Sequence, residues 1–396
     1  SAPEFLGFRA SHWMSGSATQ DYGSFYIIPG GTPCTLDHSS EQASPSYYRL
    51  GSYEMTGKSH SAIFRLVCDK IIIGVNNDCG EGFVSYDEDS HVVTGGNPVR
   101  RIYQGWGQSA GFSGWIFAEF DRKVVSCRNL DDSRLEIEFE KGDGPVLVKM
   151  GCSFKSIEGA RNNLASEIPS WDFDSVRSDV EKTWNSRLGK IEIQGGREQD
   201  REHFYCSLWH ASLLPRTVSD CGEPLDFDDF SLWDTFRALH PLLTILDPTL
   251  SGEMMQALVR KYEKGGWLPI FPAWGSYTSA MIGDHAVSVI TDAYVKGIRN
   301  FDYRTAYKAM RKNAFETPCD SLYIDGRGRR ALGTYIRYGY LPLEEPVKDA
   351  FHKGEQASRT LEYAYDDWCV SRMALRSGHI RDFFKLSRRA GNWKNV

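Results

Sequence analysis

The stretch Glu167-Ile168-Pro169-Ser170-Trp171-Asp172-Phe173-Asp174 separates two parts of the chain whose apolar residues follow different periods. Before it, 61–67, 114–120, 135–139 and 146–150 show near-alternation of apolar and polar side chains, and 22–29 and 70–75 are further short runs of strand-forming residues. Gly, Asn, Asp and Pro fill the intervals, as in turns between antiparallel strands. This part therefore predicts a β-sandwich.

After this stretch the apolar residues recur at helical spacing. The pattern predicts helices over 171–188, 198–214, 231–246, 250–263, 279–297, 302–315, 355–376 and 379–389. A short strand at 190–193 and the pair Gly195-Gly196 would act as a hinge. We therefore expect a multidomain β + α chain: an N-terminal antiparallel β-sandwich at 1–168, a helical linker at 169–197, and a helical bundle or α/α toroid at 198–396.

Composition excludes several classes of function. The 396 residues include 46 Lys and Arg against 52 Asp and Glu, a net charge of -6 without a basic block, which argues against a nucleic-acid partner. No long uncharged apolar run predicts a membrane span. The nine cysteines form no Cys-x-x-Cys motif, which argues against a zinc ribbon or a thioredoxin-type site. Aromatic residues make up 13% of the chain, and this abundance suits a site that stacks sugar rings.

The segment from Gly265 to His285 is the first candidate site. It contains Trp267 and ends in Gly283-Asp284-His285 just before a predicted helix. Loops of this kind on a rigid scaffold often carry binding residues. The alternative is that Asp284 caps the helix and His285 packs beside it.

Two further segments combine carboxylates with aromatic rings. Trp233-Asp234 at a helix start offers a stacking face and an acceptor for vicinal hydroxyls, although Asp234 could instead pair with Arg237 at i,i+3. Glu362 and Asp366 share one helical face at i,i+4, next to Asp367. Because like charges at this spacing repel, a metal, a sugar or nearby Arg359 could hold them, or they could form a solvated acidic face.

Near the N-terminus, His12 and Trp13 lie among small residues and could be donated to a neighbouring domain or simply pack. Phosphate-loop, Gly-x-Ser-x-Gly, His-Glu-x-x-His and dinucleotide motifs do not occur in the sequence. Acidic residues and aromatic rings in helix-opening loops remain, and this combination suits carbohydrate binding and glycoside hydrolysis.

Several motifs occur together in one order along the second half of the chain. They are Glu158-Gly159-Ala160-Arg161-Asn162-Asn163-Leu164, Glu167-Ile168-Pro169-Ser170-Trp171-Asp172-Phe173-Asp174, Leu232-Trp233-Asp234-Thr235-Phe236-Arg237, Gly265-Gly266-Trp267-Leu268-Pro269, Met281-Ile282-Gly283-Asp284-His285 and Leu361-Glu362-Tyr363-Ala364-Tyr365-Asp366-Asp367. Over residues 150–393 the chain thereby resembles glycoside hydrolase family 92, the calcium-dependent exo-acting α-mannosidases. The first 150 residues resemble the family more weakly, mainly through Gly7–Gly16 and the Asp21-Tyr22-Gly23 turn.

The resemblance implies an N-terminal β-sandwich followed by an (α/α)6 barrel, of which only part is present. It implies an inverting, calcium-assisted release of terminal mannose, with α-1,2-linked mannosides as the expected substrates. Trp233 and Asp234 are similar to residues of the sugar subsite that holds the terminal mannose, and Asp284 and His285 to residues lining the same region.

The chain departs from the family at its catalytic motifs. An Asn-Glu-Pro motif and a Gly-Asn-Asp-Asp motif, which carry the family's acid and base, do not occur in the helical half. We therefore expect the acid, the base and most calcium ligands beyond Val396, in a longer polypeptide, and assign no catalytic or metal-binding residue. A mannose-1-phosphate-mannose phosphodiesterase and a non-catalytic mannose-binding relative remain alternatives. The expected location is secreted or cell-envelope.

Overall fold

The computed structural model describes residues 4–9, 23–101, 103–344 and 346–396. His12 and Trp13 lie outside the described residues. The chain divides into two compact units, which are described separately. The sandwich unit comprises Ser1–Arg100, Ser109–Leu213 and Val218–Pro224, and the helical unit comprises Arg101–Gln108, Leu214–Thr217 and Leu225–Val396. The predicted domain bounds of 1–168, 169–197 and 198–396 stay a prediction.

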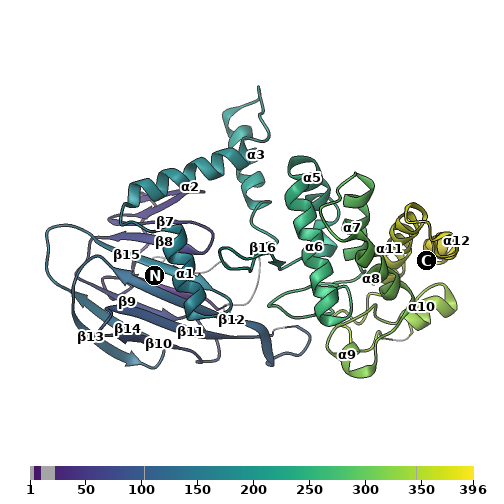
Figure 1. The fold of residues 1–396 in the computed structure, drawn as a ribbon, viewed down its shortest axis with the longest axis horizontal. Helices are drawn as coiled ribbons and strands as arrows, with labels where there is room; N and C mark the ends of the chain where they lie inside the picture. Colours follow the sequence, from purple (N-terminus) through teal and green to yellow (C-terminus); the bar gives the residue numbers. More distant parts are fainter. Residues whose placement is uncertain (1–3, 10–22, 102, 345) are drawn as a thin grey trace. The chain divides into compact units, whose positions relative to one another are not determined.

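Two antiparallel sheets form the sandwich unit (Figure 1). The larger has the order β10 (Phe83–Asp87), β11 (Val92–Arg100), β12 (Ser109–Phe120), β15 (Val146–Ser153), β8 (Ser61–Leu66), β7 (Tyr53–Gly57), β6 (Tyr47–Leu50) and β5 (Glu41–Ser44). The smaller has the order β13 (Val124–Asp131), β14 (Arg134–Phe139), β9 (Lys70–Val75), β3 (Phe25–Pro29) and β2 (Phe8–Arg9), and β1 (Glu4–Phe5) pairs separately with β4 (Cys34–Thr35). The predicted antiparallel sandwich is confirmed.

The core of the sandwich lies between these sheets. Phe64 and Leu66 of β8 and Ile71 and Ile73 of β9 are completely buried in one apolar cluster. Alternate residues of a strand point to the same face, so each strand contributes every second side chain to this cluster. The alternation at 135–139 in the sequence therefore identified core residues of β14, whereas the continuous apolar run of β9 does not distinguish its two faces.

Two helices cover the outer face of the larger sheet. α1 (Ile157–Glu167) packs on β15 and β12, and α2 (Phe173–Leu188) packs on β7 and β8. Gly151 of β15 allows the close approach of α1, because a Cβ there would overlap the carbonyl oxygen of Ala160. This packing fixes the end of α1, where Glu167 lies, against the sandwich. α3 (Glu198–His210) follows in the same unit.

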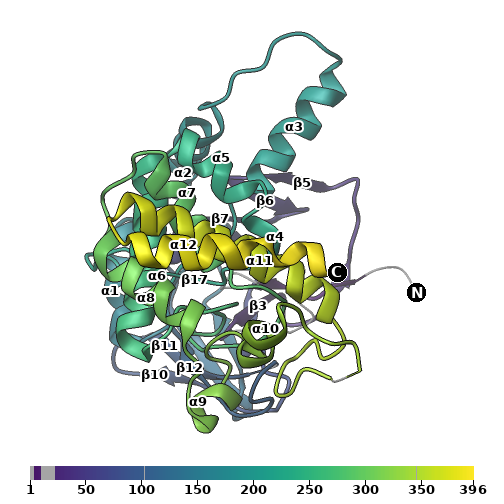
Figure 2. The same cartoon turned by 90° about the vertical axis from the view of Figure 1, so that its right-hand side faces the viewer.

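The helical unit contains the helices that follow residue 231 and a short two-stranded sheet. They are α4 (Leu232–Thr235), α5 (Leu239–Leu246), α6 (Pro248–Gly265), α7 (Ala286–Val295), α8 (Tyr303–Phe315), α9 (Asp320–Ile324), α10 (Leu332–Tyr338), α11 (Gln356–Arg376), α12 (Ile380–Arg389) and η1 (Ala390–Asn395), with β16 (Arg216–Thr217) and β17 (Phe227–Asp228). Figure 2 shows α11 and α12 side by side. Leu258, Ile290, Met310 and Met373 join α6, α7, α8 and α11 in one apolar core. The predicted helical domain is confirmed, whereas its closure into an (α/α)6 ring stays a prediction.

Three predicted elements differ from the structure. The helix predicted over 231–246 is broken into α4 and α5, because Pro241 lacks an amide hydrogen and belongs in the first turn of a helix. The helix predicted over 279–297 begins only at Ala286, since Met281 and Gly283 have φ angles of 64° and 85°. Residues 190–193 form turn and coil, so the predicted strand is wrong.

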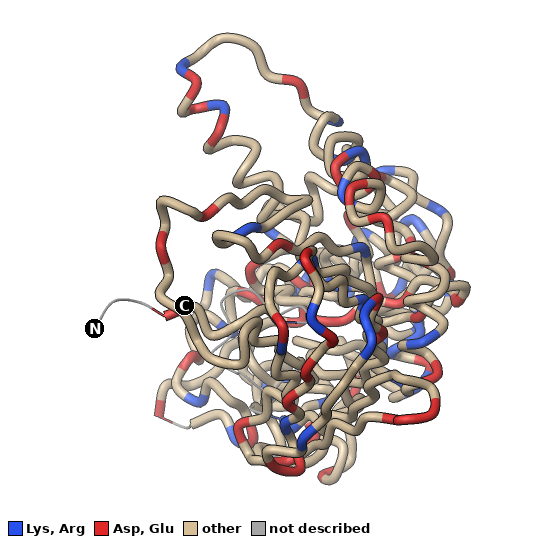
Figure 3. The backbone as a smooth tube through the Cα atoms, turned by 90° about the vertical axis from the view of Figure 1, so that its left-hand side faces the viewer, with Lys and Arg blue, Asp and Glu red and all other residues tan. Residues whose placement is uncertain are grey.

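Acidic and basic residues alternate over the backbone trace rather than segregating to separate regions (Figure 3). This distribution agrees with the absence of a basic block in the sequence. In the part of the chain that the structure describes, no helix is both long enough and apolar enough to cross a bilayer.

Candidate active site

The loop between α6 and α7 carries the first group of candidate residues. α6 ends at Gly265 and is capped by Gly266, whose φ of 79° suits a left-handed helix cap. At the other end of the loop, a Cβ on Gly283 would overlap the His285 ring. Glycine at this position thus lets the ring lie against the backbone just before α7, which fixes where His285 points.

His285 lies between two carboxylates of α11. Its Nδ1 is 3.0 Å from Asp366 Oδ1, and its Nε2 is 3.2 Å from Glu362 Oε2. These are ion-pair distances without the angles of hydrogen bonds. The ring also stacks on Phe236, with centroids 4.0 Å apart and planes 16° from parallel. One imidazole therefore ties the loop before α7 to two successive turns of α11.

The charge of His285 is set by its two acidic neighbours. The imidazole is 1% exposed, and burial alone would lower its pKa. The negative charges of Asp366 and Glu362 outweigh burial and raise the pKa of His285 to about 9. In turn His285 and Arg237 hold the pKa of Glu362 below its usual value against the effect of burial. At neutral pH the group is a cation between two carboxylates.

Trp233 joins this group through its indole. Its Nε1 donates a hydrogen bond of 3.0 Å to Glu362 Oε1, and an Arg237 guanidinium nitrogen donates to the same oxygen over 2.9 Å. The carboxylate thus fixes the orientation of the half-buried ring. Asp234 is exposed and accepts a hydrogen bond from the Ser231 hydroxyl. Arg237 pairs with Glu362 and not with Asp234, so the ion pair considered from the sequence is wrong.

Behind His285 lies a buried network of charges. The backbone amide of Asp284 donates to Asp366 Oδ2 over 2.7 Å. Asp284 Oδ2 accepts from Arg329 Nε at 2.9 Å, and Arg329 Nη1 donates to Asp367 Oδ1 at 2.7 Å. Arg389 also pairs with Asp367. The side chains of Arg329, Asp284 and Asp367 are 0% exposed, so these charges are compensated within the protein and do not face solvent.

Burial also changes the protonation of Asp284. It raises the pKa of this carboxyl to about 6, with Arg329 opposing the rise and Asp366 adding to it. Its oxygens bond Asn313 and Arg329, while the residue that precedes α7 is His285. The alternative of Asp284 as a side-chain helix cap is therefore wrong.

The structure groups most of the predicted site residues. Trp233, Asp284, His285, Asp366 and Asp367 belong to one connected network of contacts in the helical unit. Trp267 is 3% exposed, and Lys312 Nζ lies 4.4 Å from the centroid of its ring. The Trp267 ring is therefore buried within the protein, and neither of its faces is open for a sugar to stack on. His12 and Trp13 are outside the described residues.

The sequence did not identify the arginines of this network, Arg237, Arg329 and Arg389, as site residues. The i,i+4 spacing of Glu362 and Asp366 indicated that something must separate the two charges, and that group is His285. Arg359, considered for this role, donates instead to the carbonyl of His352. Arg329 comes from a loop with no recognisable motif, and only the fold reveals its two carboxylate partners.

Two acidic groups of the helical unit, the loop at 226–229 and the carboxylates around His285, do not fit a calcium site. Calcium requires about six to eight oxygen ligands. In the acidic loop at 226–229, Asp228 Oδ1 lies 2.9 Å from Lys261 Nζ and Asp229 Oδ2 lies 2.7 Å from an Arg216 nitrogen. The carboxylates around His285 likewise face cations. Because these carboxylates already face protein cations, they do not offer calcium the set of oxygen ligands that it requires.

Comparison with known proteins places the chain in a family. The sequence model of the glycosyl hydrolase family 92 catalytic domain matches residues 159–396. An uncharacterized secreted glycosidase of Arthroderma benhamiae (strain ATCC MYA-4681 / CBS 112371) is 31% identical over 264 residues, which are 64% of this chain and 31% of that protein.

Solved structures give the same answer. A family GH92 inverting mannosidase from Bacteroides thetaiotaomicron VPI-5482 matches with a TM-score of 0.87 at 25% identity, over 99% of this chain and 58% of its own. A family GH92 α-mannosidase from Bacteroides thetaiotaomicron, solved in complex with mannoimidazole, matches with a TM-score of 0.84 at 28% identity, over 99% of this chain and 57% of its own. The chain thus spans a little over half of these structures and about a third of the curated relative. Because the family model matches more than half of the chain, this protein belongs to glycosyl hydrolase family 92.

Proposed function

We propose that this chain is part of an inverting, calcium-assisted exo-α-mannosidase that releases terminal mannose, with α-1,2-linked mannosides as substrates. The observation that carries the proposal is the contact of Trp233 with Glu362, which connects an aromatic ring to the carboxylates around His285 inside the family-matched region. A fixed indole ring next to hydrogen-bonding groups is suited to the apolar face and the hydroxyls of one sugar. The solved relatives named as mannosidases support mannose as that sugar.

We divide the predicted site residues by their exposure. Trp233 is half-buried and Asp234 is exposed, so these two are proposed to contact the sugar directly. The buried residues Asp284, His285, Asp366, Asp367 and Trp267 are proposed to position them, since their polar atoms are bound to other side chains or their rings are covered. A role for His12 and Trp13 stays a prediction.

The acid and base of the reaction are assigned to the part of the family's length that this chain does not span. An inverting glycosidase needs a carboxylic acid that protonates the leaving oxygen and a carboxylate that activates water on the opposite face of the sugar. The buried and partly buried carboxylates around His285 and Arg329 face cations, which suits positioning rather than proton transfer. The calcium ligands are assigned to the same unspanned part. The secreted relative supports a secreted or cell-envelope location.

The test uses the natural gene product that contains residues 1–396. It is incubated with α-1,2-mannobiose, and proton NMR follows the anomer of mannose that forms first. We expect β-mannose, loss of activity with EDTA, and recovery when calcium is restored. Release from mannose-1-phosphate-mannose alone would establish the phosphodiesterase instead, and mannose binding without any release would establish a non-catalytic relative. Initial formation of α-mannose would contradict inversion.

A further inference from the structure

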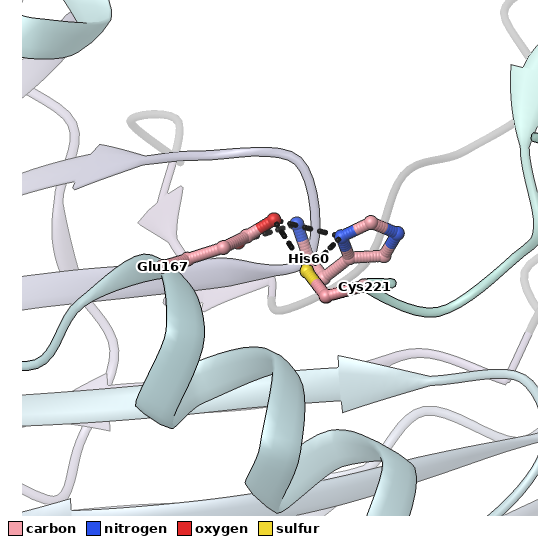
Figure 4. A group of neighbouring side chains, drawn as sticks. All are labelled: His60, Glu167 and Cys221. Atoms are coloured by element: carbon pink, nitrogen blue, oxygen red, sulfur yellow. Dashed lines mark hydrogen bonds and ion pairs between the residues drawn. The ribbon is translucent and has the colours of Figure 1, made fainter. Parts of the chain in front are cut away.

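Three side chains capable of binding a metal meet in the sandwich unit, whereas the candidate active site belongs to the helical unit (Figure 4). His60 lies in the turn before β8, Glu167 is the last residue of α1, and Cys221 belongs to the segment 218–224. His60 Nδ1 is 2.7 Å from Glu167 Oε1 and 3.6 Å from Cys221 Sγ, and the same Glu167 oxygen is 3.5 Å from Sγ. The three atoms face one another.

The remaining polar atoms of the cluster are held by the backbone. His60 Nε2 lies 2.8 Å from the carbonyl oxygen of Ser219. A carbonyl oxygen only accepts, so Nε2 keeps its hydrogen and the neutral ring has its lone pair on Nδ1, toward Glu167 and Cys221. Glu167 Oε2 accepts from the His60 backbone amide at 2.9 Å. Histidines that bind metals typically donate their second ring hydrogen to a carbonyl or carboxylate in this way.

The distances between the three atoms match a tetrahedral zinc site. With bonds of about 2.3 Å to sulfur, about 2.05 Å to nitrogen and about 2.1 Å to oxygen, tetrahedral zinc separates sulfur from either other ligand by about 3.6 Å, and nitrogen from oxygen by about 3.4 Å. The sulfur distances of 3.6 and 3.5 Å already agree with these values. The nitrogen–oxygen distance of 2.7 Å is that of a hydrogen bond, and zinc would widen it by about 0.7 Å.

We propose that His60, Glu167 and Cys221 form a zinc-binding site with one further position for solvent. Nitrogen, oxygen and thiolate sulfur are ligands that zinc accepts together, whereas calcium prefers oxygen alone. On binding, the Cys221 thiol and His60 Nδ1 release their protons to solvent, and both atoms then bond to the ion. The side chains of His60 and Glu167 are 16% and 12% exposed, which leaves access for an ion.

A catalytic cysteine is the other chemistry that this trio could suggest, and the geometry opposes it. A base that activates a thiol must have a ring nitrogen available for the sulfur. Nδ1 of His60 is closer to Glu167 Oε1, at 2.7 Å, than to Cys221 Sγ, at 3.6 Å, and Nε2 is bonded to Ser219, so the carboxylate competes with the sulfur for the ring. Burial and the adjacent Glu167 raise the pKa of the Cys221 thiol to about 11, so without a metal it is protonated at neutral pH. A metal ion removes that obstacle, because a coordinated thiol loses its proton.

The site would join three segments that are distant in the sequence. His60 and Glu167 are 107 residues apart, and Glu167 and Cys221 are 54 apart. The segment 218–224 returns to the sandwich unit after residues 214–217, which belong to the helical unit. Zinc would therefore attach this returning segment to the end of α1 and to the turn before β8.

The experiment titrates zinc into the chelator-treated 396-residue chain by calorimetry, and cobalt(II) into a parallel sample to observe the thiolate charge-transfer band. We expect one strong site per chain and a cobalt–thiolate band. Cys221→Ser is expected to weaken zinc at least about tenfold and to abolish the band. Cys206→Ser is the matched control, because Cys206 Sγ also lies 3.6 Å from a histidine, His210 Nδ1, but on exposed α3. Cys206→Ser is expected to bind zinc as tightly as the wild type does.

Circular dichroism of each variant establishes that it is folded before binding is compared. Cys221→Ala provides a second variant that removes the sulfur without adding a polar atom. Zinc is also expected to raise the thermal midpoint of the wild type and of Cys206→Ser, but not that of Cys221→Ser or Cys221→Ala. Equal zinc binding by all four proteins, loss of binding in Cys206→Ser alone, or no strong site in the wild type would overturn the proposal.

Discussion

His285 Nδ1 lies 3.0 Å from Asp366 Oδ1, and this contact links the loop before α7 to the middle of α11. The two side chains are 1% and 0% exposed, so water screens their interaction little. Glu362, one turn earlier on α11, faces the other nitrogen of the same ring at 3.2 Å. A protonated imidazole between two carboxylates is therefore an element of stability as well as of the candidate site, and it can be titrated.

Raising the pH is expected to destabilise the helical unit through His285. Its pKa is raised to about 9 in the folded protein and is about 6.5 in an unfolded chain, so the folded state binds the proton more tightly. The resulting stability is complete below pH 6.5 and is lost as the pH rises to about 9. Through this effect His285 contributes at most about 3 kcal/mol to the free energy of unfolding. Urea unfolding of the wild type and of His285→Gln, each at about pH 6.5 and at about pH 9, measures this loss. Equal losses in the two proteins would refute it.

His240 in α5 is expected to show the opposite dependence. It is completely buried, and neither ring nitrogen has a hydrogen-bond partner among the described residues. Burial lowers its pKa to about 4, so the folded state binds the proton more weakly than the unfolded chain does. Stability from this group is present above pH 6.5 and is lost as the pH falls to about 4, by up to about 3 kcal/mol. His240→Leu should lose less stability over this acidic interval than the wild type. An unchanged loss would contradict the assignment.

The fold could be predicted because its signal is local. Alternating residues such as Leu135 and Ile137 in β14 show directly which face is buried, and helical spacing does the same for α6, α8 and α11. The break between α4 and α5 has a local cause too, since Pro241 favours a first-turn position. What the sequence signalled poorly was α1, whose burial is confined mainly to Ala160, Asn163 and Leu164.

The site could be predicted only where its partners are close in sequence. Glu362 and Asp366 revealed a shared face through their spacing, but the cation between them comes from a loop before α7. Arg329, between Asp284 and Asp367, is similarly distant from both of them. Pairings of this kind depend on how helices pack, and a single sequence carries no local mark of them.

Removing Arg329 is expected to destabilise the helical unit strongly. Arg329→Ala leaves the buried carboxylate of Asp284 without its cation and Asp367 with Arg389 alone, and breaking such a buried pair costs about 3–5 kcal/mol. Arg329→Lys should recover only part of this loss, because one ammonium group cannot reproduce the two directed guanidinium contacts. Far-UV circular dichroism during urea unfolding follows the helices.

The control for this measurement is an exposed ion pair in the same unit. Arg311 pairs with Asp382 at 2.7 Å, and its side chain is 46% exposed. Arg311→Ala is expected to cost no more than about 1 kcal/mol. If Arg329→Ala and Arg311→Ala destabilise the protein equally, the buried network contributes less to the free energy of unfolding than we predict.

Asp234→Ala is expected to reduce mannoside cleavage by the natural gene product while leaving its folding intact. The Asp234 carboxylate is exposed and bonds the Ser231 hydroxyl, so its removal exposes no cavity and strands no buried charge. Charged hydrogen bonds to two sugar hydroxyls would be worth about 2–4 kcal/mol in kcat/KM, or roughly 30- to 1000-fold. Ser231→Ala removes the same intramolecular bond but keeps the carboxylate, and so should change kcat/KM much less. If both variants lose activity equally, the hydrogen bond between Ser231 and Asp234 explains the loss, and a contact of Asp234 with the sugar does not. If neither loses activity, Asp234 does not bind the substrate.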